Sequence, residues 1–284
     1  MSKRCATRSP PDHPRQDRSI VIRHTPSIRF PARLAAAATL SLAAALSPGL
    51  SAGTAAAQSD GQSDAGVTVI DPPPAGARAL ASLSAAWPDW PKADGLMEVI
   101  RREAALADRH AVLALEAESL GGLRTHLGHV QHALNPAAVP ELEEPGLGFG
   151  LIRAARDATA ESYRAGMTAA PGSAIDAGAA DLAAAFTTIS TRGRDAAILA
   201  REAAQAPSLE AAKASVEQLQ RMTAALIDGL DRNGDGAVEM RFGEAGLEQA
   251  AARFDETLKQ AGLTREDLKA LDVEGLSEMA TDAS

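Results

Sequence analysis

The stretch LEAAKASVEQLQRMTAALIDGL, residues 209–230, contains the most regular pattern in this chain. Its small and apolar residues recur at alternating steps of three and four, the spacing that places side chains on one face of an α-helix. Because this face extends over the whole stretch, the helix is expected to pack along its entire length against other helices. The members of the face are Leu209, Ala212, Val216, Leu219, Thr223, Leu226 and Leu230.

Further stretches with helical patterning flank this one. Residues 151–170, 173–206 and 247–261 each predict a helix between breakers such as Pro and Gly. Residues 94–134 predict a longer helix with a kink at Gly121–Gly122. No stretch alternates like a strand, so the sequence predicts an all-α, up-down bundle of four to five long helices. The longer helix has an apolar heptad seam at Val99, Leu106, Leu113, Leu120, Leu127 and Leu134.

The first 57 residues have the composition of a secretory signal peptide. They contain eight Lys or Arg residues and two acids, then an apolar run over residues 34–46, then a small-residue site that ends at Ala57. These are the three parts of such a leader, and we expect cleavage near Ala57 and a periplasmic or secreted protein. A mitochondrial transit peptide is the alternative. The apolar run has about 13 residues, fewer than the roughly 20 that span a bilayer, so no membrane span is expected.

Removal of this leader changes the charge of the chain. The 284 residues include 28 Lys and Arg and 37 Asp and Glu, a net charge of −9, so the part after residue 57 keeps 20 basic and 35 acidic side chains and a charge of about −15. An acidic chain with only 3% aromatic residues disfavours nucleic-acid binding. The single cysteine, Cys5, lies in the leader, which excludes Cys-ligated zinc and disulfides from the exported protein.

The chain after the leader divides into three expected parts. Residues 58–93 are rich in Ser, Gly, Asp and Pro and predict a flexible linker. Residues 94–272 predict the bundle, in which residues 208–262 form a helix–loop–helix unit at the C-terminal end, and residues 273–284 are a tail. We find no nucleophile turn, predict no catalytic residue and expect a protein that is not an enzyme. The run GLGFG, residues 146–150, lacks a preceding strand and is expected only to separate helices.

The loop between the last two predicted helices is DRNGDGAVEMRF, residues 231–242. Side-chain oxygens stand at its positions 1, 3, 5 and 9, a glycine stands at 6, and an apolar residue stands at 8. Oxygen ligands at this spacing converge on a hard cation. The loop resembles the calcium-binding loop of the EF-hand family, and the resemblance implies Ca²⁺ binding. The residues it assigns to the ion are Asp231, Asn233, Asp235, Ala237 (through its carbonyl) and Glu239.

Position 12 of the loop departs from the EF-hand family. The family has a bidentate Glu there, and this chain has Phe242. Glu244 is the nearest carboxylate that can replace it, provided that the following helix starts late. The sequence holds one such loop, so the usual pairing of two loops would need a second subunit. The alternative is a plain interhelical turn without an ion, because Asp, Asn and Gly are also the residues of turns.

Three histidines form a second candidate site. His126, His129 and His132 follow one another at steps of three on a predicted helix. Residues three apart are neighbours on a helix, so His126 with His129, or His129 with His132, can bind a transition metal such as Zn²⁺ or Cu²⁺. The alternative is a solvated polar face near the end of the helix. His110 lies close to the apolar seam, and we expect it to be a semi-buried, hydrogen-bonded residue rather than a ligand.

These patterns together favour an exported, non-catalytic helical bundle that binds Ca²⁺ through one EF-hand-like loop. Two alternatives remain open. One is a helical interaction or structural protein without a bound ion, whose seams meet a second copy or a helical partner. The other is a transition-metal-binding protein that uses the face of His126, His129 and His132.

Overall fold

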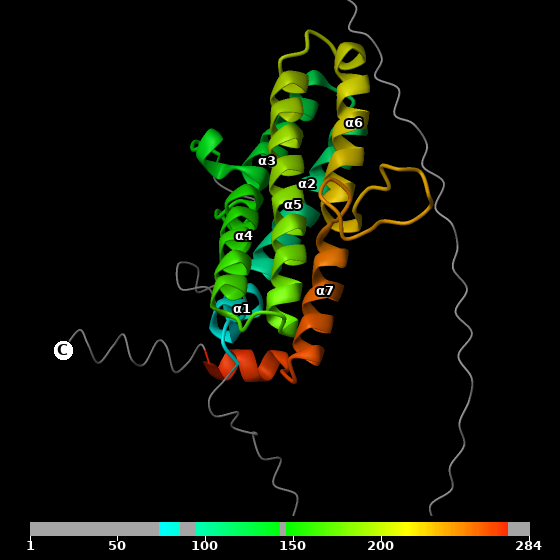
Figure 1. Cartoon of the computed structure of the whole chain (residues 1–284). Helices are drawn as coiled ribbons and strands as arrows, with labels where there is room; N and C mark the ends of the chain where they lie inside the picture. Colours follow the sequence, from blue (N-terminus) through cyan, green and yellow to red (C-terminus); the bar gives the residue numbers. More distant parts are fainter. Residues whose placement is uncertain (1–73, 86–94, 143–145, 272–284) are drawn as a thin grey trace, which may run out of the picture. The chain divides into compact units, whose positions relative to one another are not determined.

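The computed structural model describes residues 74–85, 95–142 and 146–271. This part of the chain is helical and contains no strand, which confirms the predicted all-α bundle (Figure 1). The predicted leader, the predicted tail and most of the predicted linker lie outside the described residues. The elements are α1 (Ala77–Ser84), α2 (Leu96–Leu115), α3 (Leu120–Leu134), η1 (Pro136–Ala138), α4 (Leu151–Thr168), α5 (Ala174–Ala204), α6 (Leu209–Asp228) and α7 (Leu247–Gln260).

Helix α5 is the central element of the bundle. It has 31 residues, and it packs against α3, α4, α6 and α7. Figure 1 shows α4 on one side of it and α6 followed by α7 on the other, with the connection between α6 and α7 projecting outward. Its first turn is fixed by Ser173, whose hydroxyl accepts a hydrogen bond from the Asp176 N–H at 3.2 Å. The buried residues Leu182, Phe186 and Ile189 form part of its core face.

Glycine and alanine set the distance between neighbouring helices. A Cβ atom added at Gly178 of α5 would lie 2.1 Å from the Thr257 Oγ1 of α7, and one added at Gly193 would lie 2.8 Å from a methyl group of Leu151 on α4. Both contacts require a residue without a side chain. These two glycines therefore let α5 approach α7 and α4 closely.

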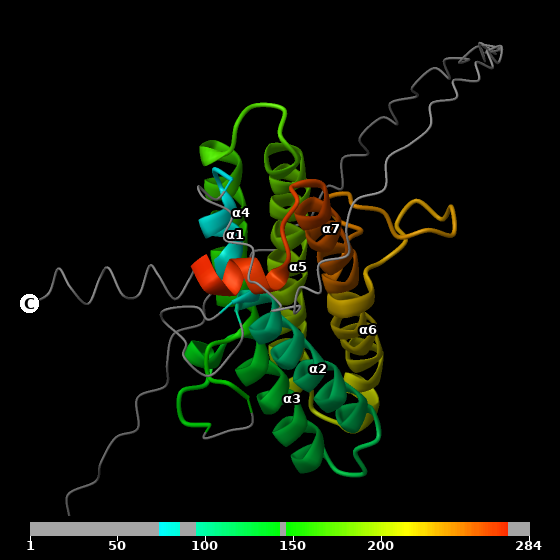
Figure 2. The same ribbon diagram turned by 90° about the horizontal axis from the view of Figure 1, so that it is seen from below.

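The predicted single helix over residues 94–134 is wrong, because the chain turns back at residues 116–119. Helix α2 ends at Leu115, and α3 begins after Ser119, whose hydroxyl accepts a hydrogen bond from the Gly122 N–H at 3.1 Å. A four-residue connection makes the two helices antiparallel neighbours (Figure 2). The cap at Ser119 and the low helix propensity of Gly121–Gly122 explain the reversal.

Part of the predicted linker belongs to the core. Residues 77–84 form α1, which packs on α4 and α2. Ala77, Leu80 and Leu83 of this helix are fully buried. Their spacing of three gives even this short segment one apolar face, and that face outweighs the surrounding Pro and Gly residues.

Candidate metal centre

The reversal between α2 and α3 brings histidines from two helices together. His110 lies near the end of α2, and His126 and His129 lie in the middle of α3. Because the helices are antiparallel, residues before the turn meet residues at a similar distance after it. The three imidazole rings are partly buried between the helices. In the described part of the chain they are the one group of three or more His, Cys, Asp or Glu side chains with ligand atoms all within 4.8 Å of one another.

The distances within this group, here called the histidine triad, are those of a metal site. The Nδ1 atom of His110 lies 3.2 Å from the Nδ1 of His126 and 3.4 Å from the Nδ1 of His129. Two nitrogens bound to one tetrahedral Zn²⁺ at about 2.0–2.1 Å lie roughly 3.3–3.4 Å apart. Since the ligand atoms of all three histidines lie within 4.8 Å of one another, the triad could hold a transition-metal ion.

The surroundings of the triad favour the neutral form of His110 and of His129. Burial lowers the pKa of His110 to about 4, and the charges of His129, His126 and Arg109 act in the same direction. Burial also lowers the pKa of His129, with further contributions from His126 and His132. Neutral imidazole is the form that binds a metal. A transition metal fits this environment better than a hard cation, since the ligands are nitrogens and no carboxylate belongs to the group.

The structure assembles a different set of histidines from the one that the sequence suggested. His126 and His129 belong to the triad, whereas His132 does not. His132 lies six residues after His126, about 240° further around the helix, and its side chain is buried. His110 is half-buried, as expected, and its polar partners are the other two imidazoles, so it is also a candidate ligand.

In the loop after α6, the side chains at positions 1, 3 and 5 of the EF-hand-like pattern accept hydrogen bonds from backbone N–H groups of the same loop. The carboxylate of Asp231 accepts hydrogen bonds from the N–H groups of Gly236 at 2.8 Å and Gly234 at 2.7 Å. These bonds lower the pKa of Asp231. Asn233 accepts from the Asp235 N–H at 2.9 Å, and Asp235 accepts from the Ala237 N–H at 2.9 Å. Position 1 is thus tied to position 6, and positions 3 and 5 each cap the residue two further on.

The second half of the loop is longer than the EF-hand pattern. Helix α7 begins only at Leu247, so the late start that Glu244 required is present. The buried carboxylate of Glu244 accepts a hydrogen bond from the Glu239 N–H at 3.3 Å, so it reaches position 9. The carboxylate of Glu239 itself forms an ion pair with Arg241. Among the described residues, the acids of the loop are not gathered into a group of three.

Comparisons of this chain with known families, proteins and structures found no relative. A scan against protein-family models, a search of curated proteins and a search of solved structures each found no match to this chain. Within the described residues, no helix has the length and apolar character that a membrane crossing requires.

Arg192 of α5 fixes the base of the loop, and the sequence analysis did not identify it. Its buried guanidinium donates hydrogen bonds to four backbone carbonyls, which join the end of α6 to the start of α7: Ala225, Gly243, Glu244 and Ala245. Thr188, one turn earlier, accepts a hydrogen bond from the Gly243 N–H at 2.9 Å. An arginine within the apolar face of a long helix was the available signal, because such a charge is buried only when it has partners.

The GLGFG run also does more than separate helices. Its Leu147 N–H donates a hydrogen bond of 3.0 Å to the carboxyl group of Glu103, which is buried on α2. A Cβ atom at Gly146 would lie 2.9 Å from that group, and Gly146 has a φ of +145°. Burial raises the pKa of Glu103 to about 7, and the backbone amides of residues 147–150 limit the rise. The glycines let the backbone close over a carboxyl group.

Proposed function

We propose that this protein binds a transition-metal ion, Zn²⁺, Cu²⁺ or Ni²⁺, through the histidine triad between α2 and α3. The observation that carries the proposal is the pair of Nδ1–Nδ1 distances, 3.2 and 3.4 Å, between residues 16 and 19 apart in sequence. Imidazole nitrogens are the kind of donor that these ions prefer, and the triad offers three of them. Three protein ligands also leave a coordination position for water or a small ligand.

A metal titration tests this proposal. Protein without a histidine tag is titrated with Zn²⁺ by calorimetry, and the variant His129→Ala is compared with His132→Gln, which changes a histidine of the same helix outside the triad. We expect His129→Ala to weaken Zn²⁺ binding by at least about 100-fold, since even loss of a hydrogen-bond partner of a metal ligand costs about 10–100-fold. His132→Gln is expected to bind like the unaltered protein. Equal affinity of the two variants would refute the proposal.

Thermal unfolding gives a second readout of the same site. A ligand that binds only the folded state stabilises it by about 2.7 kcal/mol when present at 100 times its dissociation constant. Zn²⁺ is therefore expected to raise the melting temperature of the unaltered protein and of His132→Gln. The melting temperature of His129→Ala should not respond.

We propose calcium binding by the loop of residues 231–244 as a second function. The specific observation in its favour is the bond between the Asp231 carboxylate and the Gly236 N–H, which shapes the first half of the loop around position 1. The late start of α7 and the reach of Glu244 to residue 239 supply a replacement for the Glu that position 12 lacks. A single loop with an altered ligand set is expected to bind in the weak range, about 10⁻⁴–10⁻³ M, which suits an extracytoplasmic protein.

Calorimetric titration with Ca²⁺ tests the second proposal separately from the first. Asp231→Asn and Glu244→Gln are each expected to weaken Ca²⁺ binding by about 10-fold or more, because each removes a charged ligand. Asp228→Asn changes a nearby carboxylate outside the loop and is the matched control. If Asp228→Asn and Asp231→Asn gave the same affinity as the unaltered protein, the loop would be a plain turn. The Zn²⁺ titration of the triad would be unaffected by that result.

A further inference from the structure

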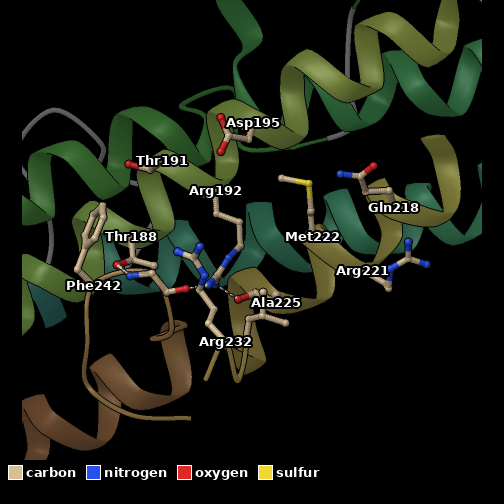
Figure 3. A pocket seen from close by; sticks show the side chains of 12 residues that line it. Thr188, Thr191, Arg192, Asp195, Gln218, Arg221, Met222, Ala225, Arg232 and Phe242 are labelled. Atoms are coloured by element: carbon tan, nitrogen blue, oxygen red, sulfur yellow. Dashed lines mark hydrogen bonds between the residues drawn. The ribbon is translucent and has the colours of Figure 1, made fainter. Parts of the chain in front are cut away.

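A cavity of about 410 Å³ lies between α5, α6 and the loop that follows α6 (Figure 3). Its size is in the range of small-molecule sites, about 300–1,000 Å³. Figure 3 shows side chains from all three elements around it: Arg192 and Asp195 from α5, Arg221 and Met222 from α6, and Arg232 and Phe242 from the loop. The histidine triad is not among the lining residues, so the cavity is a separate site.

The cavity concentrates positive charge in an acidic protein. Arg192, Arg221 and Arg232 line it, and Asp195 is the one carboxylate among the lining residues. In the described part of the chain, none of these three arginines forms an ion pair. The four bonds of Arg192 go to neutral carbonyls and leave its charge without a counter-ion.

Two of these positive charges stand next to each other. The guanidinium of Arg232 lies against Gly243, because a Cβ atom added there would be 2.6 Å from the Arg232 Nη1. The carbonyl of the same Gly243 accepts a hydrogen bond from Arg192 at 3.1 Å. Burial lowers the pKa of Arg192, and the positive charge of Arg232 lowers it further. These two positive charges repel each other, and no acid lies between them. Binding of an anion is therefore favoured, because it offsets this repulsion.

Beside the polar Thr188, Thr191 and Gln218, the cavity has apolar lining residues. Met222 lies on its α6 wall, and the loop contributes Leu230 and Phe242, which are 49% and 62% exposed. Large apolar side chains that are this exposed offer contact to a hydrocarbon chain. The anion that fits the whole cavity therefore has a charged head and an apolar chain.

We infer that this cavity binds a small amphipathic carboxylate of the medium-chain fatty acid class. Its carboxylate pairs with Arg232, beside Arg192, and its chain lies along Met222 of α6. Arg192 acts mainly as a positioning residue: it holds the base of the loop and adds positive charge to the polar end. The inference stands apart from the two metal proposals, because it uses no metal ligand.

Binding of octanoate, measured by calorimetry on the full chain in the presence of EDTA, tests this inference. EDTA removes both Ca²⁺ and transition metals, so failure of either metal proposal does not affect the result. Acetate provides the charge without the chain, and octan-1-ol provides the chain without the charge. We expect octanoate to bind about 10-fold or more tightly than either, because charge-assisted hydrogen bonds add to the apolar contact.

Two variants of the loop locate the site. Arg232→Gln removes a charge that lines the cavity, and Arg241→Gln removes a charge of the same loop that is paired with Glu239 and lies outside the lining. Arg232→Gln is expected to lower octanoate affinity by about 10-fold, and Arg241→Gln to leave it unchanged. No octanoate binding, equal binding of octan-1-ol, or equal affinities of the two variants would each overturn the inference.

Discussion

At the scale of the residue, the side chains that decide this structure are polar groups buried with partners. Arg192 is surrounded by carbonyls, Glu103 by amides, and His110 by two other imidazoles. Each joins segments that are far apart in sequence. A buried charge costs free energy unless it is neutralised or hydrogen-bonded. These positions are therefore where the protein is most sensitive to pH and substitution.

Glu103 gives the clearest prediction of this kind. Its pKa is about 7 in the folded protein and near 4.5 as an ordinary value, so between these two pH values the folded state binds more protons than the unfolded state. The stability that depends on this proton is complete below pH 4.5 and is lost as pH rises through 7. Glu103→Gln removes the ionisation and is expected to stabilise the protein at pH 8 by about 1–3 kcal/mol.

Urea unfolding at pH 8 and pH 4 measures this effect. The gain from Glu103→Gln should be present at pH 8 and close to zero at pH 4, where the carboxyl group is protonated in both states. Glu98→Gln, on the exposed side of the same helix and paired with Arg102, is the control and should show no such gain. A gain of the same size at both pH values would contradict the assignment of the effect to ionisation.

At the scale of the element, local patterns were sufficient for most helices. Serines cap both α5 and α6: Ser173 accepts a hydrogen bond from the Asp176 N–H, and Ser208 accepts one from the Ala211 N–H at 3.2 Å. The stepping of three and four predicted α6 over residues 209–228, where propensity, caps and burial agree. Leu230, the last member of the predicted face, lies beyond the helix and is 49% exposed. The heptad seam over residues 94–134 misled, because a seven-residue spacing continued by chance across the turn at residues 116–119.

The candidate metal centre depended on that one turn. His126 and His129 could be paired from their spacing on a single helix. The contribution of His110 could not be predicted, since it requires α3 to fold back on α2 and bring together residues 16 and 19 apart. Long-range contacts of this kind leave no periodic signal. The same holds for Arg192, whose partners lie 33 to 53 residues away.

At the scale of the whole molecule, one core connects nearly all the described helices. Its buried residues form a single cluster, whose members range from Ala77 in α1 to Leu268 after α7. The candidate metal centre, the loop and the arginine-lined cavity are formed by helices, or connect helices, that pack into this core. They are carried by the α2–α3 pair and the α5–α6 pair, which pack against one another through α2 and α6. A ligand at one site therefore stabilises the same folding unit as a ligand at another.

A single core predicts a single unfolding transition, even for a change at its N-terminal edge. Leu80 of α1 is fully buried, and Leu80→Ala is expected to lower the free energy of unfolding by about 2–5 kcal/mol because it leaves a cavity. Ile198→Ala, at a site on α5 that is 46% exposed, should change it by about 1 kcal/mol or less. Circular dichroism during urea unfolding should show one transition for both variants, at a lower urea concentration for Leu80→Ala. A separate early transition, or an unchanged midpoint for Leu80→Ala, would mean that α1 is not part of the cooperative core.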